Sequence, residues 1–388
     1  MQKSTLRIID NKAVLNIRER MCETPEELLD SEKFRSVLNH CLRHLKKKDS
    51  PLLRIFSSGQ NFESDIDDLV KTLSLLVKYE GSVVPHIFDK SAGFLNEPHL
   101  LNSFVEYLYD YWRHFDRFII NDSEGDRLDK RPYRTFNETI EQLTHLIRTV
   151  YRHIQENITG SHPNVYRQVR AGAEMAVISL PKDIPYPDEK YKMLNSIPVI
   201  RQILIYPPLV IQQPMNKRTG QFKKVSANPL DLASFNPDDW LCYPAKVGKL
   251  VIMVYFHLTF LELGLSMCNL FQLADDSDLI KKPDAVFIYG FQGEELDSLS
   301  DFPTVFFDDE KNRVFVGAVP GRKEFGYFGY LKKMILTLHN SIIMKSGNMP
   351  FHGAMVKILL QDNKEACILM IGDTGAGKSE TLEAFRVL

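Results

Sequence analysis

The residues of this chain that are best suited to chemistry lie near its end, in the run Gly-Asp-Thr-Gly-Ala-Gly-Lys-Ser at positions 372–379. The glycines leave backbone N–H groups open to close approach by a phosphate. Lys378 would reach the β- and γ-phosphates of a nucleotide, and the Ser379 hydroxyl would ligate magnesium or manganese. These residue types at this spacing are typical of a P-loop. The candidate phosphate-binding residues are Gly372, Asp373, Thr374, Gly375, Ala376, Gly377, Lys378, Ser379 and Glu380.

The segments on either side of this loop are those that a P-loop requires. Residues 366–371 form an unbroken apolar run, which predicts a fully buried strand directly before the glycines. Residues 379–388 contain good helix formers, so a helix is expected to begin near Ser379 and to present its positive end to the same anion. The alternative is a chance glycine-rich turn, and the order strand, loop, helix argues against it.

The residues around this loop resemble the superfamily that joins ATP-dependent phosphoenolpyruvate carboxykinase with HPr kinase. The run 372–380 resembles the HPr kinase loop, which usually has Ser at the position of Thr374. Upstream, the stretch Tyr-Phe-Gly-Tyr-Leu-Lys-Lys at 327–333 resembles the carboxykinase stretch Tyr-x-Gly-Glu-x-Lys-Lys. The stretch Pro-Phe-His-Gly-Ala at 350–354 falls where that family has Met-His-Cys-Ser-Ala. The resemblance covers residues 326–388.

The resemblance implies roles for single residues and a reaction. Lys333 and His352 correspond to the ligands of a catalytic manganese, and they are nineteen positions apart, as in the family. Tyr327 corresponds to a tyrosine on the phosphoenolpyruvate side of the site, and Lys332 to a lysine near the transferred phosphoryl group. Taken alone, a pair of lysines is usually solvated and a single histidine usually packed or on the surface. The implied reaction converts oxaloacetate and ATP to phosphoenolpyruvate, ADP and CO2, with Mg2+ or Mn2+.

Two departures from the family pattern keep other functions open. Tyr330 stands where the carboxykinases have glutamate, and Ser379 and Glu380 stand where they usually have two threonines. Both weaken the expectation of oxaloacetate as substrate, and neither affects phosphoryl transfer. One alternative is a kinase like HPr kinase, which would act on a protein serine or a small hydroxyl compound. Another is a regulatory or interaction protein in which the nucleotide acts as a switch.

A candidate binding element for a small carboxylate substrate lies in the middle of the chain, at residues 216–220. Arg218 has a planar fork of N–H donors that suits carboxylate or phosphate. Lys223 and Lys224 follow it. A solvated basic turn is the alternative. The dense cluster at residues 240–246 is interpreted as structural, with Lys246 as a further weak candidate.

Hydrophobic periodicity predicts an α+β protein of several domains. Residues 1–160 form a mainly helical region, because apolar residues repeat at helical spacing in three segments: 34–45, 66–77 and 136–154. The aromatic segment 104–118 is interpreted as helix-packing core, with a binding face as the alternative. Residues 160–163 are expected to be a boundary, beyond which residues 161–320 form an α/β domain. Residues 321–388 are expected to begin a nucleotide-binding domain.

Within residues 161–388, the sequence predicts several strands, a hairpin and a helix. The short apolar runs 175–180, 203–206, 209–212 and 286–289 predict strands. Residues 305–307 and 314–316 predict a hairpin, and residues 328–346 predict a helix. The apolar run 250–267 is interrupted by His257 and Glu262 and is interpreted as a buried element.

Composition favours a soluble globular protein. Of 388 residues, 44% are hydrophobic and 25% charged, and the formal net charge of −2 gives no basic field for nucleic acid or an anionic membrane. Five cysteines without C-x-x-C spacing fit reduced thiols, and the N-terminus lacks the apolar core of a signal peptide. We therefore expect a cytoplasmic protein with neither nucleic-acid nor membrane partners.

The chain ends at Leu388, soon after the P-loop. A nucleotide-binding domain of the carboxykinase type has further strands there, with an acidic residue for the metal and an arginine for the phosphoryl group. We therefore expect that the chain is a fragment that lacks a C-terminal part, that it is catalytically inactive alone, and that the apolar strand at 366–371 is left uncovered.

Overall fold

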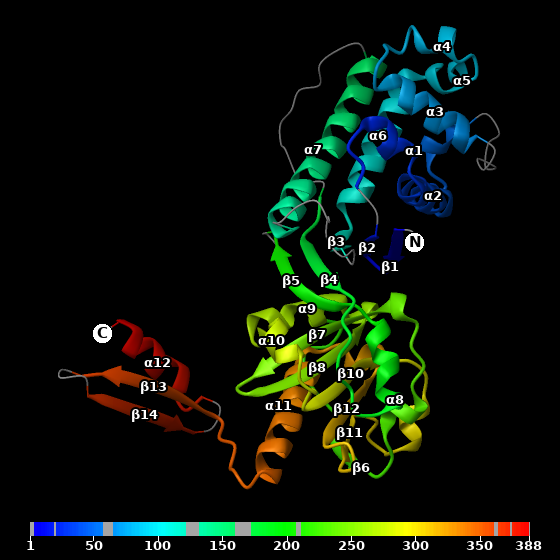
Figure 1. Ribbon diagram of the computed structural model, residues 1–388. Coiled ribbons are helices and arrows are strands. Elements are labelled where there is room, and N and C mark those ends of the chain that lie inside the picture. The colour runs from blue at the N-terminus through cyan, green and yellow to red at the C-terminus, as the bar shows by residue number, and fades with distance from the viewer. Residues whose placement is uncertain are drawn as a thin grey trace.

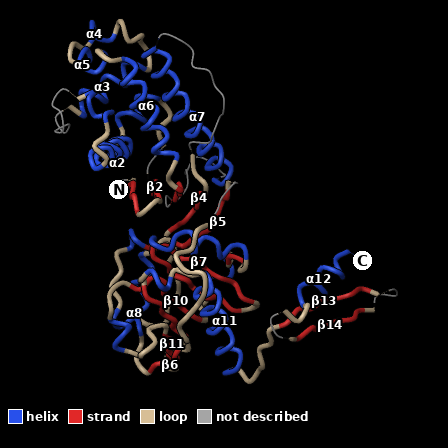
Figure 2. The backbone as a smooth tube through the Cα atoms, turned by 180° about the vertical axis from the view of Figure 1, so that it is seen from behind, coloured by secondary structure: helices blue, strands red, loops and turns tan. Residues whose placement is uncertain are grey.

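The computed structural model describes residues 4–18, 21–56, 65–121, 132–159, 172–206, 211–360, 364–372 and 375–387. A helical lobe lies above a sheet lobe, and a small unit at the end of the chain lies to one side of the sheet lobe (Figures 1 and 2). The protein is a mixed α/β protein, which is compatible with the expected α+β class. No helix among these residues has the length and apolar character that a membrane span requires.

The helical lobe is built around the apolar stripes that the sequence predicts. The stripe of α2 is buried at Val37, Leu38, Cys41, Leu42 and Leu45, and the helices α3, α6 and α7 pack on the same core. The helices of this lobe are α1 (Pro25–Asp30), α2 (Glu32–Lys47), α3 (Ile66–Leu76), α4 (Val84–Ile87), α5 (Ser91–Leu95), α6 (Pro98–Arg113) and α7 (Pro132–Thr159).

The described part of the first 160 residues also contains three strands that the sequence analysis missed. They are β1 (Thr5–Ile9), β2 (Lys12–Ile17) and β3 (Asp116–Asn121). The turn between β1 and β2 places Asp10 at φ 52°, a left-handed conformation that Asp and Asn adopt more readily than other side chains. The aromatic segment 104–118 is therefore not one helix, because α6 ends at Arg113 and the chain continues as β3.

One mixed sheet runs from the helical lobe into the sheet lobe, in the order β1-β2-β3-β4-β5-β7-β8-β10-β12-β11-β6. The pairing of β3 with β4 crosses the boundary expected at residues 160–163, which lie outside the described residues. Between the lobes, β5 meets β7 at one position, Val199 opposite Cys242. The remaining strands are β4 (Met175–Leu180), β5 (Val199–Ile205), β6 (Lys223–Val225), β7 (Trp240–Val247), β8 (Leu250–His257), β9 (Gln272–Leu273), β10 (Ala285–Phe291), β11 (Val305–Asp309) and β12 (Val314–Pro320).

Most of the predicted elements of the sheet lobe are confirmed. The runs at 175–180 and 286–289 lie in β4 and β10, the hairpin is β11–β12, and the run at 250–267 is the buried strand β8 followed by short turns that include α9 (Leu261–Leu265). Residues 203–205 of the run at 203–206 form the end of β5, and Tyr206 lies just beyond it. The run at 209–212 lies partly outside the described residues, and Ile211 and Gln212 belong to no strand.

The helix α11 (Phe328–Lys345) packs along this sheet and carries several candidate site residues. Its buried side chains are Tyr330, Leu331, Met334, Ile335 and Leu338. Gly317 on β12 permits this contact, because a Cβ atom there would lie 3.0 Å from the Met334 side chain. The other helices of this lobe are α8 (Glu189–Lys192) and α10 (Asp276–Leu279).

Ion pairs join the N-terminal hairpin to the sheet lobe. Lys12 on β2 lies 3.6 Å from Glu262 on α9, and Arg18, just after β2, lies 2.6 Å from Asp238. Arg7 on β1 pairs with Asp239. Each basic residue of the hairpin thus meets a carboxylate of the other lobe.

His257 makes stability depend on pH. Burial, and the positive charge of Arg7, lower the pKa of His257 to about 4, and its Nδ1 accepts a hydrogen bond from the Thr259 N–H at 3.2 Å. An unfolded histidine titrates near pH 6.5. The neutral imidazole therefore stabilises the fold fully above that pH, and this contribution is lost as the pH falls toward 4.

We expect the free energy of unfolding of the wild type to fall between pH 7 and pH 5, with up to about 2 kcal/mol of the fall due to His257. The variant His257→Asn keeps a hydrogen-bond acceptor but cannot titrate, so it should show a smaller fall by that amount. Urea denaturation of both proteins at the two pH values measures the difference. Equal falls in the two proteins would contradict this role of His257.

Candidate phosphate-binding site

The glycine loop at residues 372–377 connects β14 (Glu365–Ile371) to α12 (Lys378–Val387), as the sequence predicts. The strand β14 pairs antiparallel with β13 (Gly353–Leu359), from Gly353 opposite Ile371 to Leu359 opposite Glu365. Asp373 and Thr374 lie outside the described residues. Strand, loop and helix are therefore present in the order that phosphate binding requires.

Two glycines of the loop have backbone conformations that other residues rarely adopt. Gly375 has φ +82° and Gly377 has φ +77°. A side chain at either position would be strained even though the space beside it is open. Left-handed residues in such a loop allow neighbouring N–H groups to converge on one anion.

Lys378 is folded back over the loop. Its Nζ donates a hydrogen bond to the Gly372 carbonyl oxygen at 2.6 Å, so the ammonium group lies at the mouth of the loop. Thr381 donates from its Oγ1 to the Gly377 carbonyl oxygen at 2.7 Å and holds the first turn of α12. Ser379 and Glu380 are exposed in that turn. The Ser379 hydroxyl is thus available to a divalent ion that a nucleotide brings with it.

The strand before the loop is not fully buried, which corrects the prediction from the sequence. Leu369 and Ile371 on β14 are 51% and 58% exposed, and Met355 and Leu359 on β13 are 67% and 73% exposed. The physical reason is that β14 pairs with β13 and with no other strand among the described residues. The exposed apolar side chains of β14 agree with the other expectation from the sequence, that the strand at 366–371 is left uncovered.

The segment that carries Arg218 lies against the start of α11. The Met215 N–H donates to the Gly326 carbonyl oxygen at 3.1 Å, and the Phe328 N–H donates to Gln213 Oε1 at 2.9 Å. Arg218 is exposed, with its guanidinium 4.9 Å from the centre of the Phe222 ring. The structure thus brings the Arg218 segment to the same end of α11 as the half-buried Tyr327.

Tyr330 fixes this segment in place, a role that the sequence analysis missed. Its buried hydroxyl accepts hydrogen bonds from the N–H groups of Thr219 at 3.2 Å and Gly220 at 3.0 Å. The residue type alone gives no sign of this contact, because the partner Gly220 lies 110 residues earlier in the chain. Tyr330 therefore positions the Arg218 loop.

Lys332 and Lys333 occupy the second turn of α11. Lys332 is half-buried and Lys333 is exposed, and neither has a hydrogen-bond or ion-pair partner among the described residues. His352 is also exposed, in the connection that leads from the far end of α11 to β13. Lys333 and Lys345 are twelve positions apart in this helix, about 18 Å along the axis.

The residues implied as metal ligands come from two parts of the chain, Lys333 from the second turn of α11 and His352 and Ser379 from the segment beyond its end. Beyond the end of α11 the chain leads away to β13, β14 and α12, which lie to one side of the sheet lobe (Figures 1 and 2). Within the described ranges, no group of three or more His, Cys, Asp or Glu side chains is placed to hold a metal ion. The Lys333–His352 manganese site therefore stays a prediction, and the exposed Ser379 hydroxyl is available to a nucleotide-bound ion.

The other basic candidates are engaged in structural contacts. Lys246 donates to both carboxylate oxygens of Asp278, at 2.9 and 2.8 Å, and this hydrogen bonding raises the pKa of Lys246. Lys223 lies 5.3 Å from the centre of the Phe302 ring, and Lys224 lies 3.6 Å from Asp308. The cluster at residues 240–246 forms most of β7, as a structural interpretation expects.

Tyr330→Phe tests the anchoring of the Arg218 loop. The change leaves the Thr219 and Gly220 N–H groups without their acceptor, so we expect a loss of about 1–3 kcal/mol in unfolding free energy and faster hydrogen exchange at residues 216–220. The matched variant Tyr327→Phe removes a half-buried hydroxyl that bonds to no described residue, and it should change neither quantity. Exchange at 216–220 that is equally slow in both variants would contradict the anchor.

No family model, curated protein or solved structure matches this chain. What the chain binds must therefore be inferred from the geometry of the loop and the chemistry of its residues. The loop offers backbone donors, one ammonium group and one hydroxyl to a polyphosphate. The Arg218 loop offers a guanidinium to a second anion.

Proposed function

We propose that this protein is an ATP-dependent phosphotransferase that holds the nucleotide phosphates in the loop at residues 372–379. The observation that supports it most is the joint geometry of that loop. Gly375 and Gly377 are left-handed, and the Lys378 ammonium lies over the Gly372 carbonyl between a strand and a ten-residue helix. A phosphate would replace that carbonyl as the partner of Lys378, and the positive end of α12 would face the same charge.

In this proposal the chain's own groups position and stabilise charge. The loop N–H groups and Lys378 hold the terminal phosphates in line for transfer and stabilise the charge that develops on the transferred group. Ser379 would hold the magnesium ion of the nucleotide, which supplies charge neutralisation to the β- and γ-phosphates when bound. The Glu380 side chain is exposed in the same helical turn, so it does not block the magnesium ion from Ser379.

For the acceptor we propose a small carboxylate compound, as in the carboxykinase reaction that forms phosphoenolpyruvate from oxaloacetate. The support is the loop that Tyr330 fixes, which brings Arg218 to the same end of α11 as Tyr327. Lys332 follows Tyr327 by five residues and lies in α11. A guanidinium and a lysine near one another suit a dianionic substrate. Transfer requires that the unit of β13, β14 and α12 approaches this end of α11.

A second candidate is transfer to a hydroxyl group, as in HPr kinase. Tyr330 favours it, because this residue holds a loop here and cannot supply the carboxylate of the carboxykinase pattern. Hydrogen-exchange measurements with each candidate acceptor distinguish the two. Oxaloacetate or phosphoenolpyruvate should protect residues 216–220 from hydrogen exchange if the first is right, whereas a hydroxyl acceptor predicts no protection by either.

The test of the proposal is binding of ATP to the 388-residue chain, measured by isothermal titration calorimetry with Mg2+ and with EDTA. We expect saturable binding with Mg2+ that EDTA weakens strongly, because the ion offsets the charge of the phosphates. GTP and pyrophosphate are titrated in the same way. The absence of metal-dependent affinity for all three compounds would rule out the proposed function.

A further inference from the structure

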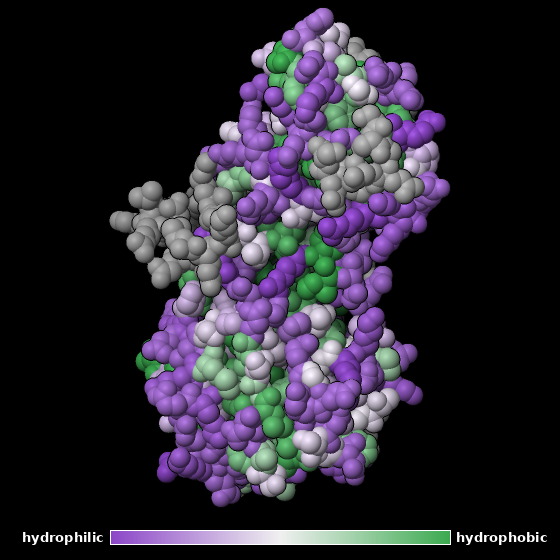
Figure 3. Space-filling view, turned by 90° about the vertical axis from the view of Figure 1, so that its right-hand side faces the viewer, coloured by the Kyte–Doolittle hydropathy of each residue, from purple (hydrophilic) through white to green (hydrophobic). Residues whose placement is uncertain are grey.

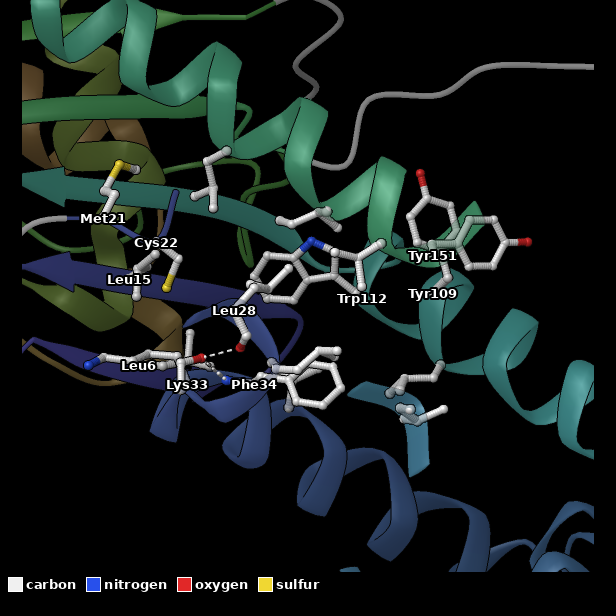
Figure 4. Close-up of a pocket in the computed structure, with 18 of the residues that line it drawn as sticks. Leu6, Leu15, Met21, Cys22, Leu28, Lys33, Phe34, Tyr109, Trp112 and Tyr151 are labelled. Atoms are coloured by element: carbon white, nitrogen blue, oxygen red, sulfur yellow. Dashed lines mark hydrogen bonds between the residues drawn. The ribbon is translucent and has the colours of Figure 1, made fainter. Parts of the chain in front are cut away.

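A cavity of about 210 Å3 lies in the helical lobe, far along the chain from the P-loop. The strands β1 and β2 form one side of it, and the helices α1, α2, α3, α6 and α7 form the others. Figure 4 shows it as an elongated space, with Leu6 and Leu15 at one end, Trp112 in the middle, and Tyr109 and Tyr151 at the other end.

The walls of the cavity are almost wholly apolar. Its floor consists of buried aliphatic side chains from five helices, among them Leu29, Leu73, Val150 and Ile154. Ser31 also lines it, but the hydroxyl donates to the Leu28 carbonyl oxygen at 2.7 Å and accepts from the Phe34 N–H at 3.1 Å. A water molecule inside would therefore find few hydrogen-bond partners, and such cavities stay dry and bind apolar molecules.

The cavity reaches the surface along one rim. Met21, Cys22, Leu28 and Lys33 line it and are half-buried, whereas the floor residues are buried. On the side of the molecule that carries β1 and β2, apolar residues gather in the waist between the two lobes (Figure 3). A ligand could thus enter lengthwise without displacing the core.

Shape and charge indicate the class of ligand. An engineered apolar cavity of about 150 Å3 holds benzene, so this larger and longer space suits an alkyl chain better than a compact ring. Lys33 is the one charged side chain among the described residues that line it. In Figure 4 the Lys33 side chain extends past Leu6, away from Trp112.

We propose that this cavity binds the hydrocarbon chain of a long-chain carboxylate, with the carboxylate at the rim beside Lys33. The chain lies between the floor residues and Trp112, which removes its apolar surface from water. The aromatic residues Trp112 and Tyr109 thus serve a ligand in addition to the helix packing that the sequence analysis favours for this segment. The site is independent of the P-loop and of the proposed phosphoryl transfer.

The experiment titrates the 388-residue chain with a dansylated undecanoic acid, followed by displacement with unlabelled dodecanoate and with its methyl ester. We expect saturable binding with one site per chain, and tighter displacement by the carboxylate than by the ester. Filling the floor with Val150→Phe should weaken binding by at least about tenfold. Cys22→Trp, which places a bulky side chain at the half-buried rim, should have the same effect and guards against misfolding of the first variant.

Lys33→Ala should weaken binding of dodecanoate by about threefold, because a charge pair at the half-buried rim contributes little free energy. It should leave binding of the ester unchanged. The matched control is Lys47→Ala, an exposed lysine on the same helix that does not line the cavity. No saturable binding by the wild type, or wild-type affinity in the Cys22→Trp variant, would overturn the proposal. Equal loss in Lys33→Ala and Lys47→Ala would overturn the position given to the carboxylate.

Discussion

Replacing Lys378 by alanine is expected to weaken the binding of ATP with Mg2+ by at least about 100-fold. The ammonium group lies 2.6 Å from the Gly372 carbonyl oxygen at the mouth of the loop, where it can meet two phosphate oxygens. Each hydrogen bond to a charged group is worth about 1.5–3 kcal/mol, and two of them correspond to that change in affinity. Calorimetric titration of the variant and the wild type measures the effect.

The matched control is Lys357→Ala. Lys357 lies on β13 in the same small unit and pairs with Glu365 at 2.6 Å, so it contributes the same charge without facing the loop. Its removal should leave the affinity for ATP within about threefold of the wild type. Similar losses in both variants would indicate a general electrostatic effect, and unchanged affinity in Lys378→Ala would exclude the loop as the phosphate site.

Replacing Phe287 by alanine is expected to lower the free energy of unfolding by about 3–5 kcal/mol. Phe287 is fully buried on β10, between Val254 of β8 and Gly317 of β12, in the core that α11 covers. The loss combines the apolar surface of the ring with a cavity that neighbouring strands cannot fill. Urea denaturation followed by circular dichroism measures it.

Phe302→Ala is the control for that substitution. The Phe302 side chain is 39% exposed, and its ring contacts the Lys223 ammonium, so the change should cost less than about 1 kcal/mol. A cost at Phe302 that equals the cost at Phe287 would contradict this description of the core. Below the unfolding transition, both variants should bind ATP as the wild type does, because the glycine loop lies outside the sheet lobe.

The features that the sequence predicts well are those that depend on neighbouring residues. The P-loop needs glycines at fixed spacing between an apolar run and a helix, and all of these are local. The hairpin β11–β12 is visible because two apolar runs flank an acidic turn at residues 308–310. The helix α11 follows from apolar residues at helical spacing, and the structure ends it at Lys345, one residue before the predicted end.

The features that the sequence does not predict depend on distant partners. Tyr330 bonds to a loop 110 residues earlier in the chain, and its chemistry gives no sign of that contact. The strand β3 enters the sheet between β2 and β4, although the aromatic residues before it have helical spacing. An apolar run such as 366–371 predicts burial only if another surface covers it, and the described residues provide none for most of β14.

The ion pairs of the N-terminal hairpin have a consequence for the shape of the molecule. Added salt shortens the Debye length from about 10 Å at 0.1 M to about 3 Å at 1 M, which weakens pairs such as Arg18–Asp238 at a partly exposed surface. Since β5 meets β7 at a single position, the backbone offers little resistance to tilting there. We therefore expect the helical lobe to move more freely relative to the sheet lobe at 1 M salt than in dilute buffer.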